Sequence, residues 1–175
     1  MTENSKDKFL LLFNPDNQVR TLDIRIASLT EKSKNSGIPT LVIVSKTFGE
    51  ETTVMWLKVQ LTSIITFAGI KIDETVDVQL KELARIISKK HYMLNVYELM
   101  KFFAMFKSGE YDGFYGKFEP LLITKALLQF REQRCEDIDK YEKENIAKEI
   151  EQHKNNPNAI SYQEYQQIIN QKKHV

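Results

Sequence analysis

Apolar residues recur at helical spacing along most of this chain, and this periodicity limits its fold more than any other property. Between 54 and 68, 75 and 90, 95 and 106, and 120 and 130, apolar side chains return every three or four residues. Each stretch can therefore form a helix with one continuous apolar face to bury. The sequence predicts an all-α fold, a compact multi-helix bundle with a long C-terminal helical arm.

Polar residues and prolines mark where these helices should begin. Asn95-Val96-Tyr97-Glu98 and Ser161-Tyr162-Gln163-Glu164 have the form of a capping box, in which the first and fourth residues satisfy each other's backbone N–H groups. Pro39 and Pro120 suit the first position of a helix, where a missing N–H costs nothing. We therefore expect helices to start at each of these four places.

The 175 residues are enough for one hydrophobic core and too few for two full domains. We expect a mobile N-terminal segment with a weak helix over 1–37, in which the apolar Phe9–Phe13 forms a short strand or a peripheral segment. A helical core domain should cover 38–135, followed by a charged helical arm and a short terminal helix over 136–175. The arm alternates charges around a thin apolar seam, which favours a solvated projection or a coiled-coil-like contact that could form a homo-oligomer.

Composition excludes several classes of protein. The net charge is only +1, so no global field attracts the chain to nucleic acid or an anionic membrane. Cys135 is the only cysteine, which excludes an intramolecular disulfide and fits a reducing compartment. Because no apolar run approaches the roughly twenty residues that span a bilayer, we expect a soluble, cytoplasmic protein without a membrane partner.

Residue patterns typical of catalysis or of metal binding are missing from the sequence. His91, His153 and His174 have no spacing that would gather them on one metal ion. Phosphate-binding glycine loops and a nucleophile elbow are also missing. The acidic residues follow helix starts or alternate with lysines and arginines, without a paired acid in an apolar setting. We therefore expect a protein that is not an enzyme and carries no metal and no cofactor.

A loop over 109–116 is the strongest candidate for a binding site. Gly109, Gly113 and Gly116 break the helical period and supply the loop geometry. Its aromatic side chains, flanked by lysines, could stack on bases or fill a groove on a partner protein. The alternative is that the aromatics fold inward and join the flanking helices, which the large area that aromatics bury favours.

Basic residues also outnumber acidic ones between Lys81 and Arg134. If several basic side chains converged on one face they could bind phosphates, whereas a scattered solvated surface is the alternative that the sequence favours. The candidate residues for binding a partner protein or nucleic acid are Lys107, Tyr111, Phe114, Tyr115, Lys117, Arg131 and Arg134.

Short motifs over about 38–135, with a further one over 160–165, carry a resemblance to a known family. They include Ile38-Pro39-Thr40, Phe48-Gly49-Glu50-Glu51-Thr52, Trp56-Leu57, Phe106-Lys107-Ser108-Gly109-Glu110-Tyr111, Phe114-Tyr115-Gly116 and Ile160-Ser161-Tyr162-Gln163-Glu164-Tyr165. In these residues the chain resembles a family of uncharacterised proteins common in anaerobic gut bacteria and their mobile elements. Where that family's loop usually reads Gly-Glu-Tyr-Gly, this sequence has Asp112 as the fourth residue.

A looser similarity of spacing indicates a function. The residues involved are Leu94, Glu98-Leu99, Phe102-Phe103, Gly109, Tyr111, Ile123, Leu127, Phe130 and Arg134. In their spacing the chain is similar to the small helical domains of phage helicase loaders and replisome organisers. The resemblance implies a non-enzymatic accessory factor of phage or mobile-element DNA replication that contacts a protein such as a helicase. The alternative function is direct nucleic-acid binding through a local basic and aromatic patch.

Overall fold

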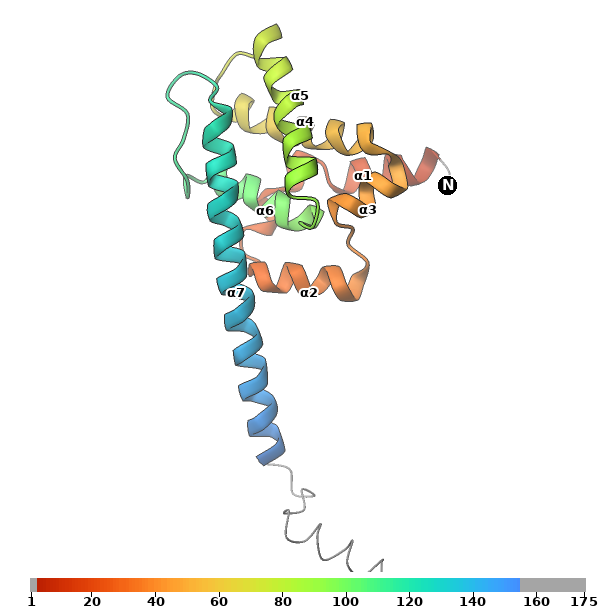
Figure 1. Cartoon of the computed structure of the whole chain (residues 1–175), viewed down its shortest axis with the longest axis vertical. Helices are drawn as coiled ribbons and strands as arrows, with labels where there is room; N and C mark the ends of the chain where they lie inside the picture. Colours follow the sequence, from red (N-terminus) through yellow and green to blue (C-terminus); the bar gives the residue numbers. More distant parts are fainter. Residues whose placement is uncertain (1–2, 155–175) are drawn as a thin grey trace, which may run out of the picture. The chain divides into compact units, whose positions relative to one another are not determined.

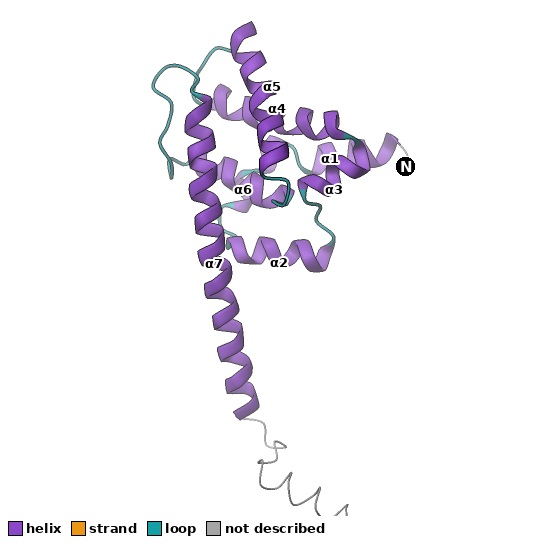
Figure 2. Ribbon diagram, viewed as in Figure 1, coloured by secondary structure: helices purple, strands orange, loops and turns teal. Residues whose placement is uncertain are grey.

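Helices make up most of residues 3–154, which are the residues that the computed structural model describes (Figures 1 and 2). They are α1 (Glu3–Leu12), the 3₁₀ helices η1 (Pro15–Asn17) and η2 (Val19–Thr21), α2 (Ile26–Ser36), α3 (Leu41–Phe48), α4 (Glu50–Phe67), α5 (Glu74–Lys90), α6 (Val96–Lys107) and α7 (Pro120–Lys154). In this part of the chain there is no strand, only an isolated bridge between Thr40 and Asn95. The predicted all-α fold is confirmed.

The chain divides into two compact units, Met1–Asp137 and Ile138–Val175. The 35-residue helix α7 contributes residues to both units. The predicted long C-terminal helix is therefore confirmed. The short terminal helix expected after Ser161 lies outside the described residues.

Helix α4 is central to the first unit, where it packs against α3, α5 and α6. Leu57, Leu61 and Ile65 lie one helical turn apart on its inner face and are completely buried. Helix α6 adds Phe102, whose ring centroid lies 5.6 Å from that of Phe130 on α7. These contacts join the four predicted helical stretches into one core, as their apolar faces require.

The N-terminal residues belong to this core, which therefore begins well before residue 38. Residues Phe9–Phe13 continue α1 and its C-terminal end instead of forming a strand. Phe9 and Phe13 are four residues apart and share one helix face, so both rings are buried. The ring of Phe9 lies 6.0 Å from Trp56, and that of Phe13 lies 5.3 Å from Tyr97. Two aromatic anchors thus fix α1 on the bundle.

Pro39 does not begin a helix, in contrast to our expectation. Its carbonyl accepts a hydrogen bond from the N–H of Val96 at 3.1 Å, and the N–H of Leu41 donates to Leu94 O at 3.0 Å. The backbone around Thr40 is extended because it pairs with the segment that precedes α6. Helix α3 consequently starts only at Leu41.

The other predicted helix starts are confirmed within the described residues. The side chain of Asn95 accepts a hydrogen bond from Glu98 N at 2.9 Å, and Glu98 Oε2 accepts one from Asn95 N at 2.9 Å. This is the reciprocal pair of a capping box. Helix α7 begins at Pro120, as expected for a proline at the first helical position.

Candidate protein-binding surface

The aromatic loop between α6 and α7 is largely a structural element. Tyr111, one of the candidate binding residues, is only 8% exposed, so it follows the alternative in which the loop aromatics fold inward. Its ring packs at 5.7 Å from Phe102, and its hydroxyl donates to Gln133 Oε1 at 2.8 Å. Burial and the charge of Glu110 raise the pKa of Tyr111 well above its usual range. The residue therefore joins the loop to α6 and α7.

The remaining loop aromatics have opposite environments. Phe114 packs between Phe106 and Phe118, with ring centroids 5.4 Å and 5.7 Å away. Tyr115, in contrast, is 84% exposed. The chain turns at Gly109 and Gly116, whose φ angles of 85° and 75° favour glycine, whereas Gly113 has no positive φ. Only Tyr115 among the three candidate aromatics faces solvent.

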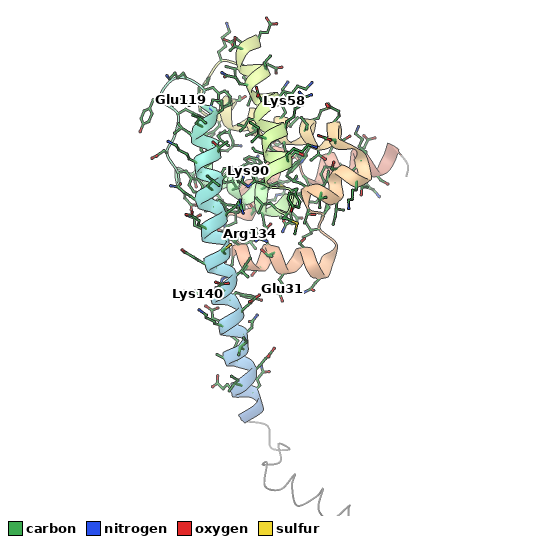
Figure 3. All side chains as sticks on the ribbon, in the orientation of Figure 1. Glu31, Lys58, Lys90, Glu119, Arg134 and Lys140 are labelled. Carbon is green, nitrogen blue, oxygen red and sulfur yellow. The ribbon has the colours of Figure 1, made fainter. Side chains whose placement is uncertain are left out.

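Two of the basic residues that were candidates for binding a partner or nucleic acid instead form contacts within the first unit. Lys107 Nζ donates to Ser63 Oγ at 2.7 Å and lies 6.0 Å from the centre of the Phe67 ring. Burial lowers the pKa of Lys107, against the opposing effect of Asp16. Arg134, labelled on α7 in Figure 3, pairs through Nε with Glu98 Oε1 at 2.7 Å. Neither side chain is available to neutralise a phosphate in this arrangement.

Lys117 and Arg131 keep exposed side chains. Lys117 lies 3.7 Å from Glu119, a pairing of two exposed groups that solvent screens. Arg131 acts electrostatically on the buried His91: burial, together with the positive charges of Arg131 and Lys90, lowers the pKa of His91 to about 4. Of the seven candidate binding residues, Tyr115, Lys117 and Arg131 are therefore the ones with exposed side chains.

A pocket of about 240 Å³ lies between α1, η1 and α4. Its lining is almost entirely apolar and includes Leu10, Phe13, Pro15, Met55, Trp56 and Val59. The wall is held by hydrogen bonds, because Trp56 Nε1 and Gln60 Nε2 both donate to Phe13 O at 2.7 Å. Gln18 Nε2 in turn donates to Gln60 Oε1 at 2.6 Å. The pocket is thus preformed by α4 and the turn after α1.

Met55 and Val59 form a ridge on the outer face of α4, at the edge of this pocket. They are 62% and 52% exposed, and they lie about one helical turn apart, so they form one apolar surface. Both also line a second depression, an open groove of about 410 Å³ between α4 and α5. Lys58 and Asp77, 2.6 Å apart, lie in this groove, and Figure 3 labels Lys58 there. The result is an apolar ridge between two depressions.

The sequence analysis missed this surface, although it contains a signal for it. In α4, apolar residues occupy more positions than one buried face can hold: Met55 lies between the buried Val54 and Trp56, and Val59 between the buried Leu57 and Leu61. The apolar residues of the inner face alone account for the burial of this helix, so Met55 and Val59 are surplus to it. Surplus apolar residues on a helix are the sequence feature that can reveal an exposed contact face.

Residues 3–154 contain no group of three or more His, Cys, Asp or Glu side chains that could hold a metal ion. In the same residues no helix is long and apolar enough to cross a membrane.

Comparison with known proteins places the chain in a family but gives no activity. No curated protein and no solved structure gives a significant match. A family of unknown function, DUF6633, matches residues 75–174, which contain α5, α6, the aromatic loop and α7. The ridge on α4 precedes this region. Because the match covers more than half of the sequence, the chain belongs to the DUF6633 family of unknown function.

Proposed function

We propose that this chain is a non-enzymatic binding protein, an accessory factor of phage or mobile-element DNA replication that contacts a replication protein such as a helicase. The observation that carries the binding role is the exposed ridge of Met55 and Val59 beside a preformed apolar pocket. Apolar side chains exposed in this way are typical of protein interaction sites. The replication role is supported by the helicase-loader spacing of α6, its loop and α7.

A binding measurement with purified proteins tests this function. The replicative helicase, primase and initiator encoded in the same genome are each titrated against the full chain by fluorescence anisotropy. We expect one of them to bind, and Met55→Glu to weaken that binding at least tenfold. Met93→Glu is the matched control, because Met93 is 63% exposed and lies on neither depression. If none of the three proteins binds, the proposed replication role is wrong.

Direct nucleic-acid binding is the second candidate function, and the exposed Tyr115 beside Lys117 favours it. An aromatic face next to a cation can stack on a base while the cation contacts a phosphate. Binding of this kind weakens steeply as salt rises, because counterions are released. A labelled single strand titrated at several salt concentrations tests it: Tyr115→Ala and Lys117→Ala should each reduce affinity, and a salt-independent signal would exclude this function.

A further inference from the structure

The ridge of Met55 and Val59 determines how a partner can reach the α4 surface. Both side chains line the pocket beside α1 and also the groove beside α5. A partner that covers the ridge therefore meets both depressions at once. Such a partner would bury both exposed side chains and fill the pocket, so the apolar surface of the ridge and of the pocket would leave water in a single binding event.

The sizes of the depressions favour side chains of a polypeptide as occupants. At about 240 Å³ the pocket is smaller than the roughly 300–1,000 Å³ of typical small-molecule sites. It can hold a single large apolar side chain as an anchor of the kind that dominates protein interfaces. The groove, at about 410 Å³, is open and bordered by charged groups, which suits a second side chain of the same segment.

The charges around the ridge indicate which sign of charge a partner should carry. Lys58 pairs with Asp77 at 2.6 Å, and Glu51 with Arg85 at 3.5 Å. Lys6 on the pocket and Lys81 on the groove have no ion pair within residues 3–154. The groove is lined by two lysines and two carboxylates, and both carboxylates are paired, one of them with Arg85 just outside the groove. Lys81 is therefore the cation left over on the groove, as Lys6 is on the pocket, so a complementary partner carries carboxylates there.

We propose that the α4 surface binds an acidic segment of a partner protein, in which two large apolar side chains straddle Met55 and Val59. One apolar side chain occupies the pocket beside α1, the other lies in the groove beside α5, and carboxylates next to them face Lys6 and Lys81. This inference rests on the proposed protein-binding function and specifies the chemistry of the segment that is bound.

Trp56 provides the measurement, because it is the only tryptophan of the chain and lines the pocket. The probes are three synthetic peptides without tryptophan that share the same leucine and phenylalanine anchors and carry Glu, Gln or Lys as flanking residues. Each is titrated against the full chain while Trp56 fluorescence is recorded. We expect saturable binding of the Glu peptide, at least tenfold tighter than that of the Lys peptide. Equal or tighter binding of the Lys peptide would overturn the proposal.

Variants locate the binding and test its charge preference. Met55→Glu should abolish the Glu peptide's signal, whereas Met93→Glu should leave it unchanged. The double variant Lys6→Glu, Lys81→Glu should bind the Lys peptide more tightly than the Glu peptide. The control is the double variant Lys46→Glu, Lys125→Glu, which changes two exposed lysines elsewhere and should keep the preference for the Glu peptide. Equal losses of peptide affinity in Met55→Glu and Met93→Glu would overturn the proposal. It would also be overturned if the unchanged chain self-associates and Met55→Glu is monomeric, because a second copy of the chain would then cover the ridge.

The outcomes separate this inference from the proposed function. If the Glu peptide binds with this specificity but no replication protein does, the replication role fails and the docking chemistry stands. If a replication protein binds Met55→Glu as tightly as the unchanged chain, the function stands and the α4 surface is not its docking site.

Discussion

Glu98 is completely buried, and its carboxylate accepts hydrogen bonds from three helices. The donors are Asn95 N at the start of α6, Thr30 Oγ1 on α2 at 2.5 Å and Arg134 Nε on α7 at 2.7 Å. A buried carboxylate is tolerated only when its oxygens are satisfied in this way. Arg134, which the sequence presented as a nucleic-acid contact, is therefore better understood as the counter-ion of this carboxylate.

The two partners of this pair should differ in their effect on stability. Arg134→Met removes the ion-pair partner of the buried Glu98 side chain, which should lower the free energy of unfolding by about 3 kcal/mol. Glu98→Gln should cost less, because its amide oxygen still accepts hydrogen bonds and the arginine side chain, 24% exposed, can turn to water. Urea denaturation of both variants measures the difference. A smaller loss in Arg134→Met than in Glu98→Gln would contradict this account of the pair.

The loop tyrosines offer a second comparison between residues. Tyr111→Ala removes a buried ring and should lower the free energy of unfolding by about 3 kcal/mol, whereas Tyr115→Ala should change it by less than about 0.5 kcal/mol. Thermal melts of the two variants provide the measurement. Tyr111→Phe, which removes only the hydroxyl that bonds Gln133, should lose about 1 kcal/mol. If both alanine variants melted at the same temperature as the unchanged chain, the loop would not stabilise the core.

His91 should make stability depend on pH in the acidic range. The pKa of His91 falls from 6.5 to about 4 on folding, so between these values the unfolded chain binds more protons. The free energy of unfolding should therefore decrease as the pH is lowered from 6.5 to 4, by up to about 1.4 kcal/mol per pH unit. Urea titrations at several pH values should show a shallower slope for the uncharged variant His91→Met. An unchanged slope would mean that other groups cause the dependence.

At the scale of the helices, α1 should be essential to the fold. Phe9→Ala removes a ring that contacts Phe48 and Trp56 and should lower the free energy of unfolding by about 3–5 kcal/mol. Leu11→Ala is the matched control, because Leu11 lies on the same helix and is 71% exposed. Chemical denaturation followed by circular dichroism compares them. A loss of less than about 1 kcal/mol in Phe9→Ala would restore the expectation that this segment is peripheral.

Periodicity predicted the long helices well and the short ones poorly. In α5 and α6 a regular apolar face and a polar cap both point to the same boundaries, so Asp73 and Asn95 cap helices as their types suggest. In α1 the five consecutive apolar residues conceal the four-residue spacing of Phe9 and Phe13. The pairing of Thr40 with Asn95 is a tertiary contact between distant segments, and local rules cannot detect it.

The candidate site differs from the sequence prediction for a related reason. Residue types such as Tyr111 and Arg134 suit both a contact surface and a packed interior, and only their tertiary partners decide between the two. Met55 and Val59 are ordinary core residues by type. Their exposure follows from the way α1 and α5 flank the outer face of α4 and leave the ridge uncovered.

At the scale of the whole molecule, the hydrophobic core that the described residues form, from Phe9 to Phe130, lies in the first unit. The arm begins after Asp137, whose carboxylate accepts hydrogen bonds from Arg25 Nε at 2.6 Å and Ala27 N at 2.9 Å. These contacts fasten α7 to the start of α2 within the first unit. Residues beyond them add to the length of α7, where Ile146 and Ile150 are both about half exposed.

A chain that ends at Glu144 should therefore keep its fold. We expect the same urea midpoint as for the full chain, because the core residues from Phe9 to Phe130 and the Arg25–Asp137 pair are retained. The helical circular dichroism signal should decrease, because residues 145–154 of α7 are removed. Sedimentation of the full and the truncated chain then shows which part mediates any self-association. If truncation abolishes self-association, the contact lies in the arm; if self-association is retained, the contact lies in the first unit. A truncated chain with a clearly lower midpoint would show that the arm is part of the cooperative fold.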